Sequence, residues 1–209
     1  MDELQSEGIM LILSSPSGAG KTTISNELIN KESNLVKSIS VTTRKPRPGE
    51  IDGKDYHFIN EKEFFSLCNT GQMLEHAIVF NYHYGIPRES AENNLKNGVN
   101  VLFSIDWQGA ASLTRVMKEK VVSIFILPPS IKELQFRLKK RNCKTPDDEI
   151  KNRLDQACFE MERCLYYDYV IINDNIDDSV QKIRQILYSE KMKVKRKMNL
   201  KNFLHNMSH

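Results

Sequence analysis

The stretch SPSGAGKT, residues 15–22, lies between the apolar run Ile9–Leu13 and a segment with helix-like apolar spacing. In such a strand–turn–helix setting, backbone N–H groups and a helix N-terminus surround nucleotide phosphates, so the stretch indicates a phosphate-binding loop. Lys21 then reaches the β- and γ-phosphates, and the Thr22 hydroxyl helps to hold Mg2+. Ser15 stands where the motif G-x-x-x-x-G-K-[ST] has its first glycine. The alternative is an ordinary strand–turn–helix that happens to contain Gly-Lys-Thr.

The charge and cysteine patterns narrow the class of protein. The 209 residues include 30 basic and 27 acidic ones, and a net charge of +3 is too balanced to indicate nucleic-acid binding. Met1–Glu7 is acidic and polar, unlike a signal peptide, and no apolar run approaches the about 20 residues that span a bilayer. The four cysteines show neither a C-x-x-C pair nor a zinc spacing. We therefore expect a cytoplasmic protein with reduced thiols and with neither a nucleic-acid nor a membrane partner.

Apolar runs predict a parallel β-sheet with helices on both faces, because helical patterns separate several of them. The five predicted strands are Ile9–Leu13, Val36–Val41, Val101–Ile105, Val121–Leu127 and Tyr169–Ile172. In such sheets the ligand lies beyond the carboxyl ends of the strands. The phosphate loop and Asp106 both follow a strand, so we expect them at the same edge.

Capping residues predict several helix boundaries. They are Asn60 with Glu63 at one start and Gly71 at its end, Ser130 with Glu133, Thr145–Asp148, and Asp177. The helix after residue 148 carries apolar residues at near-helical spacing, namely Ile150, Leu154, Cys158, Met161 and Leu165. Because Cys158 lies on this stripe, we expect it to have a packing role.

Two regions interrupt the alternation of strands and helices. Residues 42–98 begin with a loop dense in proline and positive charge, and we interpret them as a lobe inserted after the second strand. Residues 137–153 carry three arginines. The chain becomes basic from Lys191 onward, and we expect a solvated helix or a disordered end there.

At this point the chain closely resembles the bacterial type of the guanylate kinase family. The resemblance rests on the blocks S-S-P-S-G-A-G-K-T-T, S-V-T-T-R-K-P-R-P-G-E, G-K-D-Y-H-F, M-L-E-H-A, Y-G-I-P-R, I-D-W-Q-G, P-P-S and Y-D-Y-V-I-I-N-D. It implies direct, Mg2+-dependent phosphoryl transfer from ATP to GMP and dGMP. It also implies a P-loop NTPase-type parallel core flanked by helices, an inserted mixed α/β lobe for the nucleoside monophosphate, and a helical lid.

The resemblance assigns the parts of the chain and the donor site. The domain spans residues 7–188, with a core of 7–38, 99–136 and 168–188, a GMP-binding lobe of 39–98 and a lid of 137–167, followed by a basic tail of 189–209. The residues implied to bind ATP are Ser15, Pro16, Ser17, Gly18, Ala19, Gly20, Lys21, Thr22, Thr23, Asn173 and Asp174. Asn173 and Asp174 match residues near the adenine, although an Asn-Asp turn is the alternative.

Arginines and tyrosines are the implied holders of the GMP phosphate. Arg44 and Arg47 can each grip phosphate oxygens bidentately, and Tyr56 and Tyr84 can add hydroxyl donors. The resemblance gives these four residues that role and puts Ser40 beside them. Taken without the resemblance, the arginine block is more typical of a solvated basic turn.

Glu75 is the expected reader of the base. Guanine presents the adjacent donors N1–H and N2–H2, and one carboxylate accepts both, whereas adenine has an acceptor at N1. Sites built on such hydrogen bonds discriminate by about 10^4 or more. The alternative is a surface glutamate at a helix end.

Asp106 and the lid arginines complete the implied site. Asp106 matches an acidic strand-end residue that contacts Mg2+ directly or through water and lies in the GMP site, although such residues also serve as turn formers. Arg141 and Arg153 match the family's lid arginines, and Arg137 shares a helix face with Arg141. The implied catalytic set is Lys21, Arg44, Arg137, Arg141 and Arg153, and exposed ion pairing is the alternative for the lid arginines.

The chain departs from the family pattern at Ser15, at Ile86, at Ser104 and in a lid one residue longer than usual. Ile86 stands where a Ser or Thr usually contacts guanine, and Ser104 where an acidic residue is usual. Two other functions fit parts of the pattern, namely a non-catalytic interaction module and a kinase with another acceptor. The intact Gly-Lys-Thr speaks against the first, and Glu75 against the second.

Overall fold

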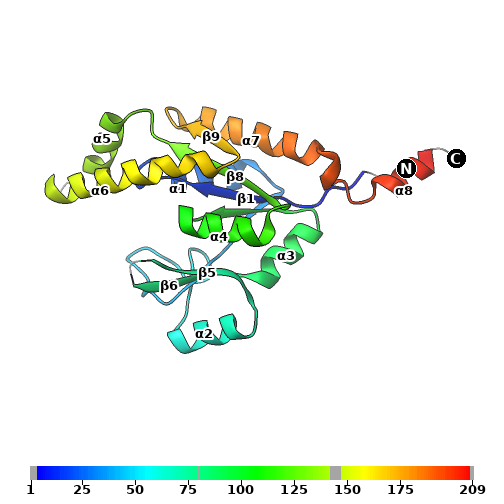
Figure 1. The fold of residues 1–209 in the computed structure, drawn as a ribbon, viewed down its shortest axis with the longest axis horizontal. Helices are drawn as coiled ribbons and strands as arrows, with labels where there is room; N and C mark the ends of the chain where they lie inside the picture. The colour runs from blue at the N-terminus through cyan, green and yellow to red at the C-terminus, as the bar shows by residue number, and fades with distance from the viewer. Residues whose placement is uncertain (1–3, 80, 142–146, 208–209) are drawn as a thin grey trace.

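The core of the fold is a parallel sheet whose strands come from distant parts of the chain (Figure 1). The computed structural model describes residues 4–79, 81–141 and 147–207. The sheet has the order β2-β7-β1-β8-β9, and each neighbouring pair is parallel. In that order the strands are Leu35–Lys37, Asn100–Ser104, Met10–Ser14, Val121–Leu127 and Tyr169–Ile172. The predicted α/β class is confirmed, and every strand except β2 ends within one residue of its prediction.

The predicted strand Val36–Val41 is wrong as a single element. Leu35–Lys37 forms β2 at the edge of the core sheet, whereas Val41 begins β3 (Val41–Thr42) in a second sheet. The chain crosses between the two sheets at residues 38–40. An apolar run shows that residues are buried and does not show which sheet buries them.

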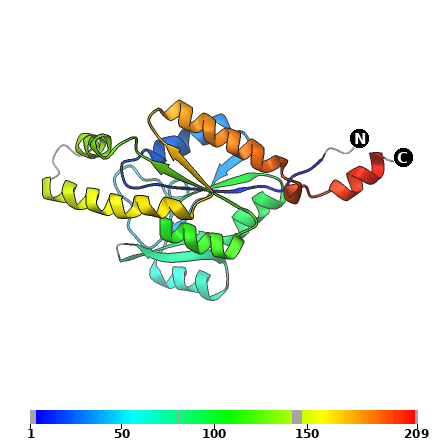
Figure 2. The ribbon, with the colours of Figure 1, turned by 45° about the horizontal axis from the view of Figure 1, so that its top comes forward.

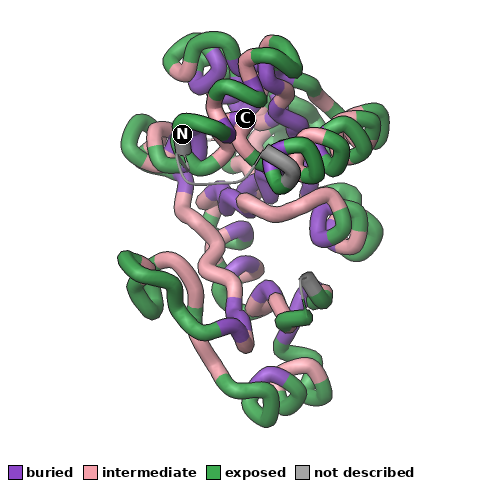
Figure 3. Tube along the Cα trace, turned by 90° about the vertical axis from the view of Figure 1, so that its left-hand side faces the viewer, coloured by how far each residue is buried: buried purple, intermediate pink, exposed green. Residues whose placement is uncertain are grey.

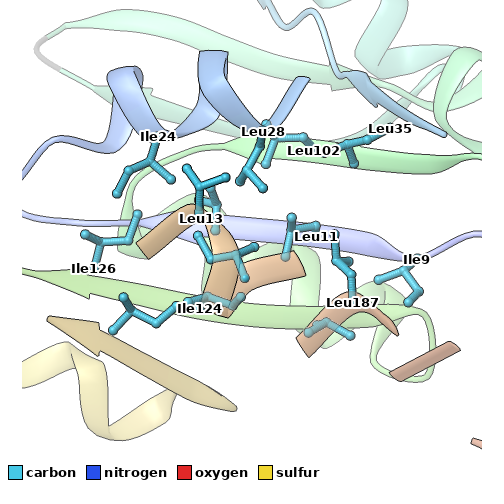
Figure 4. Packing of buried hydrophobic residues seen from close by; sticks show 14 residues of the cluster. Ile9, Leu11, Leu13, Ile24, Leu28, Leu35, Leu102, Ile124, Ile126 and Leu187 are labelled. Carbon is cyan, nitrogen blue, oxygen red and sulfur yellow. The ribbon is translucent and has the colours of Figure 1, made fainter. Parts of the chain in front are cut away.

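Helices cover both faces of the core sheet because the strand β1 is buried on both sides. Leu11 and Leu13 pack in a cluster with residues of α1 (Lys21–Lys31) and α7 (Ile176–Met192), as Figure 4 shows. Met10 and Ile12 point the other way, into a cluster with residues of α3 (Arg88–Lys96) and α4 (Trp107–Met117). The two-residue period of a strand sends neighbours to opposite faces, so both faces need apolar residues.

Residues 41–87 form a lobe with its own mixed sheet of order β4-β3-β6-β5. Its strands are His57–Phe58, Val41–Thr42, Tyr82–Pro87 and Met73–Val79, and its helix α2 spans Glu61–Asn69. Figure 1 shows α4 lying between the core sheet and this lobe, and Figure 3 shows that buried residues are sparser in the lobe than in the core. The arrangement matches the predicted insertion after the second strand of the core.

The predicted lid of 137–167 contains α6 (Asp147–Met161) and the end of α5 (Ile131–Arg141). These two helices pack on each other through Leu134, Leu138 and Ala157. The expected interior position of Cys158 is wrong, because this residue is exposed. The helical stripe also ends early: a 3-10 turn over Glu162–Tyr166 follows α6, and Leu165 is 84% exposed. Thr145 and Pro146 of the predicted cap lie outside the described residues.

Two of the predicted helix caps are confirmed and one is wrong. Asn60 and Glu63 form a reciprocal capping box on α2, and the Ser130 hydroxyl accepts a hydrogen bond from the Glu133 N–H. The cap of α7 is Asn175, whose side chain accepts from the Asp178 N–H, and Asp177 lies in the first turn. Asn and Asp are comparable caps, so the sequence around residue 175 did not decide between them.

The C-terminal segment is tied to the core before it extends from it. After α7, a 3-10 turn over Val194–Arg196 places the Arg196 guanidinium, 3% exposed, against the Glu190 carboxylate at 3.4 Å. The Arg196 carbonyl accepts from the Glu7 N–H at 3.0 Å. A tail that is solvated throughout is therefore wrong at Arg196, whereas α8 (Leu200–Met207) extends outward from the core (Figure 2). None of the helices in the described ranges is long and apolar enough to cross a membrane.

Replacing Arg196 by methionine is expected to lower the free energy of unfolding by about 2 kcal/mol, because Glu190 loses its buried guanidinium partner and keeps only Lys193 and the Tyr169 hydroxyl. Urea unfolding followed by circular dichroism measures the change. Lys195→Met is the control, since its pair with Glu119 is exposed and contributes at most about 1 kcal/mol. Equal losses in the two variants would contradict a structural role for the buried pair.

Candidate active site

The phosphate loop joins the end of β1 to the start of α1. Gly18 and Gly20 adopt φ values of +90° and +101°, which L side chains rarely adopt. A Cβ atom on Gly20 would lie 2.4 Å from the Asn173 side-chain nitrogen. Ser15 has no positive φ, because Asn81 is the only described non-glycine residue in that region. The replacement of the motif's first glycine therefore introduces no backbone strain.

Asn173, predicted to lie near the adenine, supports the loop from beneath. Its side-chain nitrogen donates to the Ala19 carbonyl at 2.8 Å, and its oxygen accepts from the Ser179 hydroxyl at 3.0 Å. Asn173 is 2% exposed, whereas Asp174 is exposed at the surface. The contact observed for Asn173 is thus with the backbone of the donor loop.

Lys21 is the first residue of α1 and lies beside the segment that joins β7 to α4, and its charge interacts with that of Glu160 on α6. Its ammonium donates to the Ile105 carbonyl at 3.0 Å, and Asp106 follows that carbonyl and caps α4 by accepting from the Gly109 N–H at 2.9 Å. Burial lowers the pKa of Lys21 to about 8, although the charges of Asp106 and of Glu160 on α6 oppose the shift. Burial and the charge of Asp106 raise the pKa of Glu160. Sequence reasoning missed Glu160, because only the folded chain brings the end of α6 close to Lys21 and Asp106.

The pKa of Lys21 gives the site a pH dependence. An ammonium attracts phosphates and a neutral amine does not, so the affinity for ATP is expected to weaken as the pH rises through about 8, by up to tenfold per unit above the pKa. Equilibrium binding of ATP between pH 7 and pH 9.5 measures this. Lys21→Arg stays charged over the whole range, so its affinity should be flat; an equally steep loss in that variant would contradict the assignment.

Glu75 is a buried carboxylate with an oxygen that lacks a partner. It is 8% exposed, and no described group donates a hydrogen bond to its Oε2. Burial, reinforced by the charge of Asp106, raises its pKa to about 7, against a hydrogen bond from Ser112. Gly109 lets α4 approach closely, because a Cβ there would lie 3.3 Å from Glu75 Oε1. An unpaired buried acceptor is costly, which makes Glu75 ready to accept donors from a ligand.

Ile86 lies directly opposite Glu75 in the β5–β6 ladder and is 1% exposed. It packs in the same apolar cluster as Leu74 and Phe103. Cross-strand partners have Cβ atoms about 5 Å apart, so a hydroxyl at position 86 is near the Glu75 carboxylate.

Ile86→Thr is expected to raise kcat/KM for GMP a few-fold, about the value of one hydrogen bond, without changing KM for ATP. Because Ile86 is fully buried, the variant should also be less stable by about 1 kcal/mol or more. Steady-state kinetics with a melting curve checks both. An unchanged or lower kcat/KM for GMP would show that position 86 makes no contact with the acceptor.

A cavity of about 250 Å3 lies between the start of α1 and the lobe. It is lined by Thr22, Ser25, Asn26, Lys37, Ser38, Ser40, Glu50, Asp55, Tyr56, Phe103 and Ser104. The structure thus brings together Thr22 from the predicted donor site, Ser40 and Tyr56 from the predicted acceptor site, and Ser104.

Arg44 and Arg47 differ in their surroundings. Arg44 is 8% exposed, donates to the Tyr84 hydroxyl and the Glu50 carboxylate, and lies over the Tyr56 ring at 5.4 Å. Arg47 is exposed. Sequence reasoning missed Glu50, although its place in the block R-K-P-R-P-G-E, six residues after Arg44, was a signal.

Of the predicted lid arginines, Arg137 lies by the donor loop and Arg153 is engaged on its own helix. Arg137 donates to the Asn173 carbonyl at 3.3 Å and to Glu133 at 2.8 Å. Arg153 pairs with Glu149, one turn before it on α6. The side chain of Arg141 lies outside the described residues. Trp107 lies against Phe159 and under the Arg163 guanidinium at 4.7 Å.

Comparison with known proteins decides the family. The family model described as guanylate kinase matches residues 7–190. This chain belongs to the guanylate kinase family. It is 58% identical to the guanylate kinase of Ehrlichia chaffeensis (strain ATCC CRL-10679 / Arkansas) over 98% of both chains, and 58% identical to that of Wolbachia pipientis wMel over 91% of this chain and 94% of the relative. A crystal structure of guanylate kinase from Anaplasma phagocytophilum matches it with a TM-score of 0.80, at 44% identity over 97% of this chain and 96% of that chain.

Membership confirms the resemblance drawn from the sequence blocks. The chain is a nucleoside-monophosphate kinase, and the reaction of its family is phosphoryl transfer from ATP to GMP. The parallel core flanked by helices matches the solved guanylate kinase structure.

Proposed function

We propose that the loop of residues 15–23 holds ATP and that the cleft beside it holds GMP, with Glu75 reading the guanine. The observation that carries this proposal is the unpaired Oε2 of a carboxylate that is 8% exposed and faces Asp106 and α4. Guanine supplies two adjacent donors for it. The contact involves the base and not the sugar, so dGMP is proposed as a second acceptor.

The reaction proposed is a direct in-line transfer. The bond from the γ-phosphorus to the bridging β–γ oxygen of ATP breaks, a bond from a GMP phosphate oxygen to that phosphorus forms, and ADP leaves. The acceptor oxygen is already anionic, so no residue has to remove a proton. Catalysis then comes from positioning and charge neutralisation by Lys21, Arg44 and the lid arginines Arg137, Arg141 and Arg153.

Mg2+ fits the donor site through oxygen ligands. The Thr22 hydroxyl is exposed at the start of α1, and Asp106 lies beside Lys21. Mg2+ typically takes one or two protein oxygens together with oxygens of substrate phosphates, and Thr22 and Asp106 can supply the protein oxygens. When bound, the ion neutralises charge on the β- and γ-phosphates.

We propose residues 39–98 as the acceptor lobe, 137–167 as the lid, and 189–209 as a tail outside the nucleotide sites. The cytoplasm is the proposed location, because the four cysteines show neither a C-x-x-C pair nor a zinc spacing. ATP and GMP are the proposed partners, with neither nucleic acid nor membrane.

Phosphorus NMR of the protein with ATP, GMP and Mg2+ tests the reaction. We expect ADP and GDP to accumulate in equal amounts, and excess EDTA to stop both. ADP with inorganic phosphate in place of GDP would show hydrolysis and would contradict the transfer.

A further inference from the structure

Arg44 has almost no hydrogen-bonding capacity left for a ligand. Its Nε donates to the Tyr84 hydroxyl at 3.1 Å, its Nη1 to the Lys45 carbonyl at 2.7 Å and to Glu50 Oε2 at 2.8 Å, and its Nη2 to Glu50 Oε1 at 2.9 Å. These bonds use four of the five N–H groups of a guanidinium. The edge made by the two terminal nitrogens, which is suited to bidentate contact with a phosphate, is already occupied by Glu50.

Glu50 is fixed by the loop that carries it. Residues 47–50 form a turn in which the Glu50 N–H donates to the Arg47 carbonyl at 3.0 Å. Pro48 and Gly49 occupy the two central positions, and Gly49 has φ +87°, as a type II turn requires. The Glu50 carboxylate also accepts from the Arg47 N–H at 2.7 Å. The Glu50 carboxylate thus accepts three hydrogen bonds, two from Arg44 and one from Arg47. It is therefore a fixed part of this loop and does not merely occupy the place of a ligand.

Tyr84 is the route by which Arg44 acts on the acceptor. The Tyr84 hydroxyl accepts from Arg44, so its own proton remains to be donated, and a donor bonded to a charged group is polarised. Tyr56 lies edge-on to Tyr84, with ring centroids 5.9 Å apart, and under the Arg44 guanidinium. An acceptor phosphate bound here would have the Tyr84 hydroxyl, the Tyr56 hydroxyl and a single remaining N–H of Arg44 as donors.

We propose that Glu50 is a positioning residue that locks Arg44, that Arg44 acts on the acceptor phosphate mainly through Tyr84, and that the exposed Arg47 supplies the bidentate grip. The two arginines, which look equivalent in the sequence, then have different tasks. The proposal rests on GMP being the acceptor in this cleft.

The sign of one kinetic change separates this proposal from simple electrostatics. Glu50→Gln removes a negative charge near an anionic phosphate, which by Coulomb's law alone should strengthen GMP binding. If Glu50 positions Arg44, the variant should instead raise KM for GMP about tenfold, the value of one charge-assisted hydrogen bond, while KM for ATP stays unchanged. Asp55→Asn is the matched control, because it removes the same charge from the same cavity without touching the guanidinium.

Three measurements make the test decisive. Melting curves show that each variant is folded, and calorimetric titration with GMP and with guanosine reports affinity without turnover. We expect Glu50→Gln to weaken GMP but not guanosine, Asp55→Asn to weaken neither, and the effects of Glu50→Gln and Tyr84→Phe on GMP to be less than additive. Tighter or unchanged GMP binding in Glu50→Gln, or full additivity, would overturn the proposal. Failure of the unmodified enzyme to phosphorylate GMP would overturn the proposed acceptor instead.

Discussion

Glu75→Gln is expected to lower kcat/KM for GMP by about 100-fold and to raise that for AMP. A glutamine of the same shape accepts only one of guanine's two donors and turns its amide N–H2 toward the other, which costs about 3 kcal/mol. The same amide complements adenine, because it donates to N1 and accepts from the exocyclic amine. Steady-state kinetics with both acceptors at fixed Mg-ATP measures the change in preference.

The pH dependence of the affinity for GMP provides a second test of the role of Glu75. Its pKa of about 7 in the nucleotide-free enzyme means that the carboxylate becomes protonated as the pH falls below 7, so affinity for GMP should weaken there. The Gln variant has no such group, so it should show only the loss below about pH 6 that comes from protonation of the GMP phosphate. Glu119→Gln is the control, because Glu119 is 82% exposed. The pH profile of its GMP affinity should match that of the unmodified enzyme. Unchanged preference in Glu75→Gln would show that the base is read elsewhere.

Gly20→Ala is expected to lower kcat/KM for ATP by about 100-fold. The added Cβ would lie 2.4 Å from the Asn173 nitrogen, in a residue with φ +101°. The left-handed conformation costs about 1–2 kcal/mol, and displacing Asn173 from the Ala19 carbonyl adds the loss of a buried hydrogen bond. Kinetics at saturating GMP measures the effect.

Gly71→Ala is the control that separates the backbone cost of Gly20→Ala from the cost of displacing Asn173. Gly71 has φ +70° at the end of α2, but nothing lies within 4 Å of a Cβ there. It should lose stability and keep its KM for ATP. If both variants affected ATP use equally, the contact between Asn173 and the loop would not shape the donor site.

The sequence predicted correctly those elements that depend on residues close to one another in the chain. The phosphate loop, four of the core strands and the capping box of α2 each depend on residues that are close in sequence. Val36–Val41 was misassigned because joining one sheet or the other depends on partners such as Asn100–Ser104 and Tyr82–Pro87, which are distant in the chain. Leu165 was misassigned because the α-helix ends at Met161 and a 3-10 turn follows. Cys158 was misassigned because Ala157, and not its neighbour Cys158, is the buried residue in that turn of α6.

The sequence indicated which residues belong to the candidate site more readily than which residues they contact. The blocks identified Lys21, Arg44 and Glu75, but not that Glu50 engages Arg44 or that Asn173 holds the loop. Both contacts depend on chain geometry: a turn folds Glu50 back toward Arg44, and the fold brings Asn173 to Ala19, 154 residues away. The burial that raises the pKa of Glu75 likewise arises only when α4 packs beside β5.

Recognition of guanine by the Glu75 cleft is tested most directly by comparing acceptors. The measurement is kcat/KM for ADP release from Mg-ATP with GMP, AMP, CMP, UMP and dTMP under one set of conditions. We predict that GMP exceeds each of the others by about 10^4-fold, as expected of a site built on buried hydrogen bonds. A comparable rate with any other acceptor, or no turnover with any of them in folded protein, would contradict it.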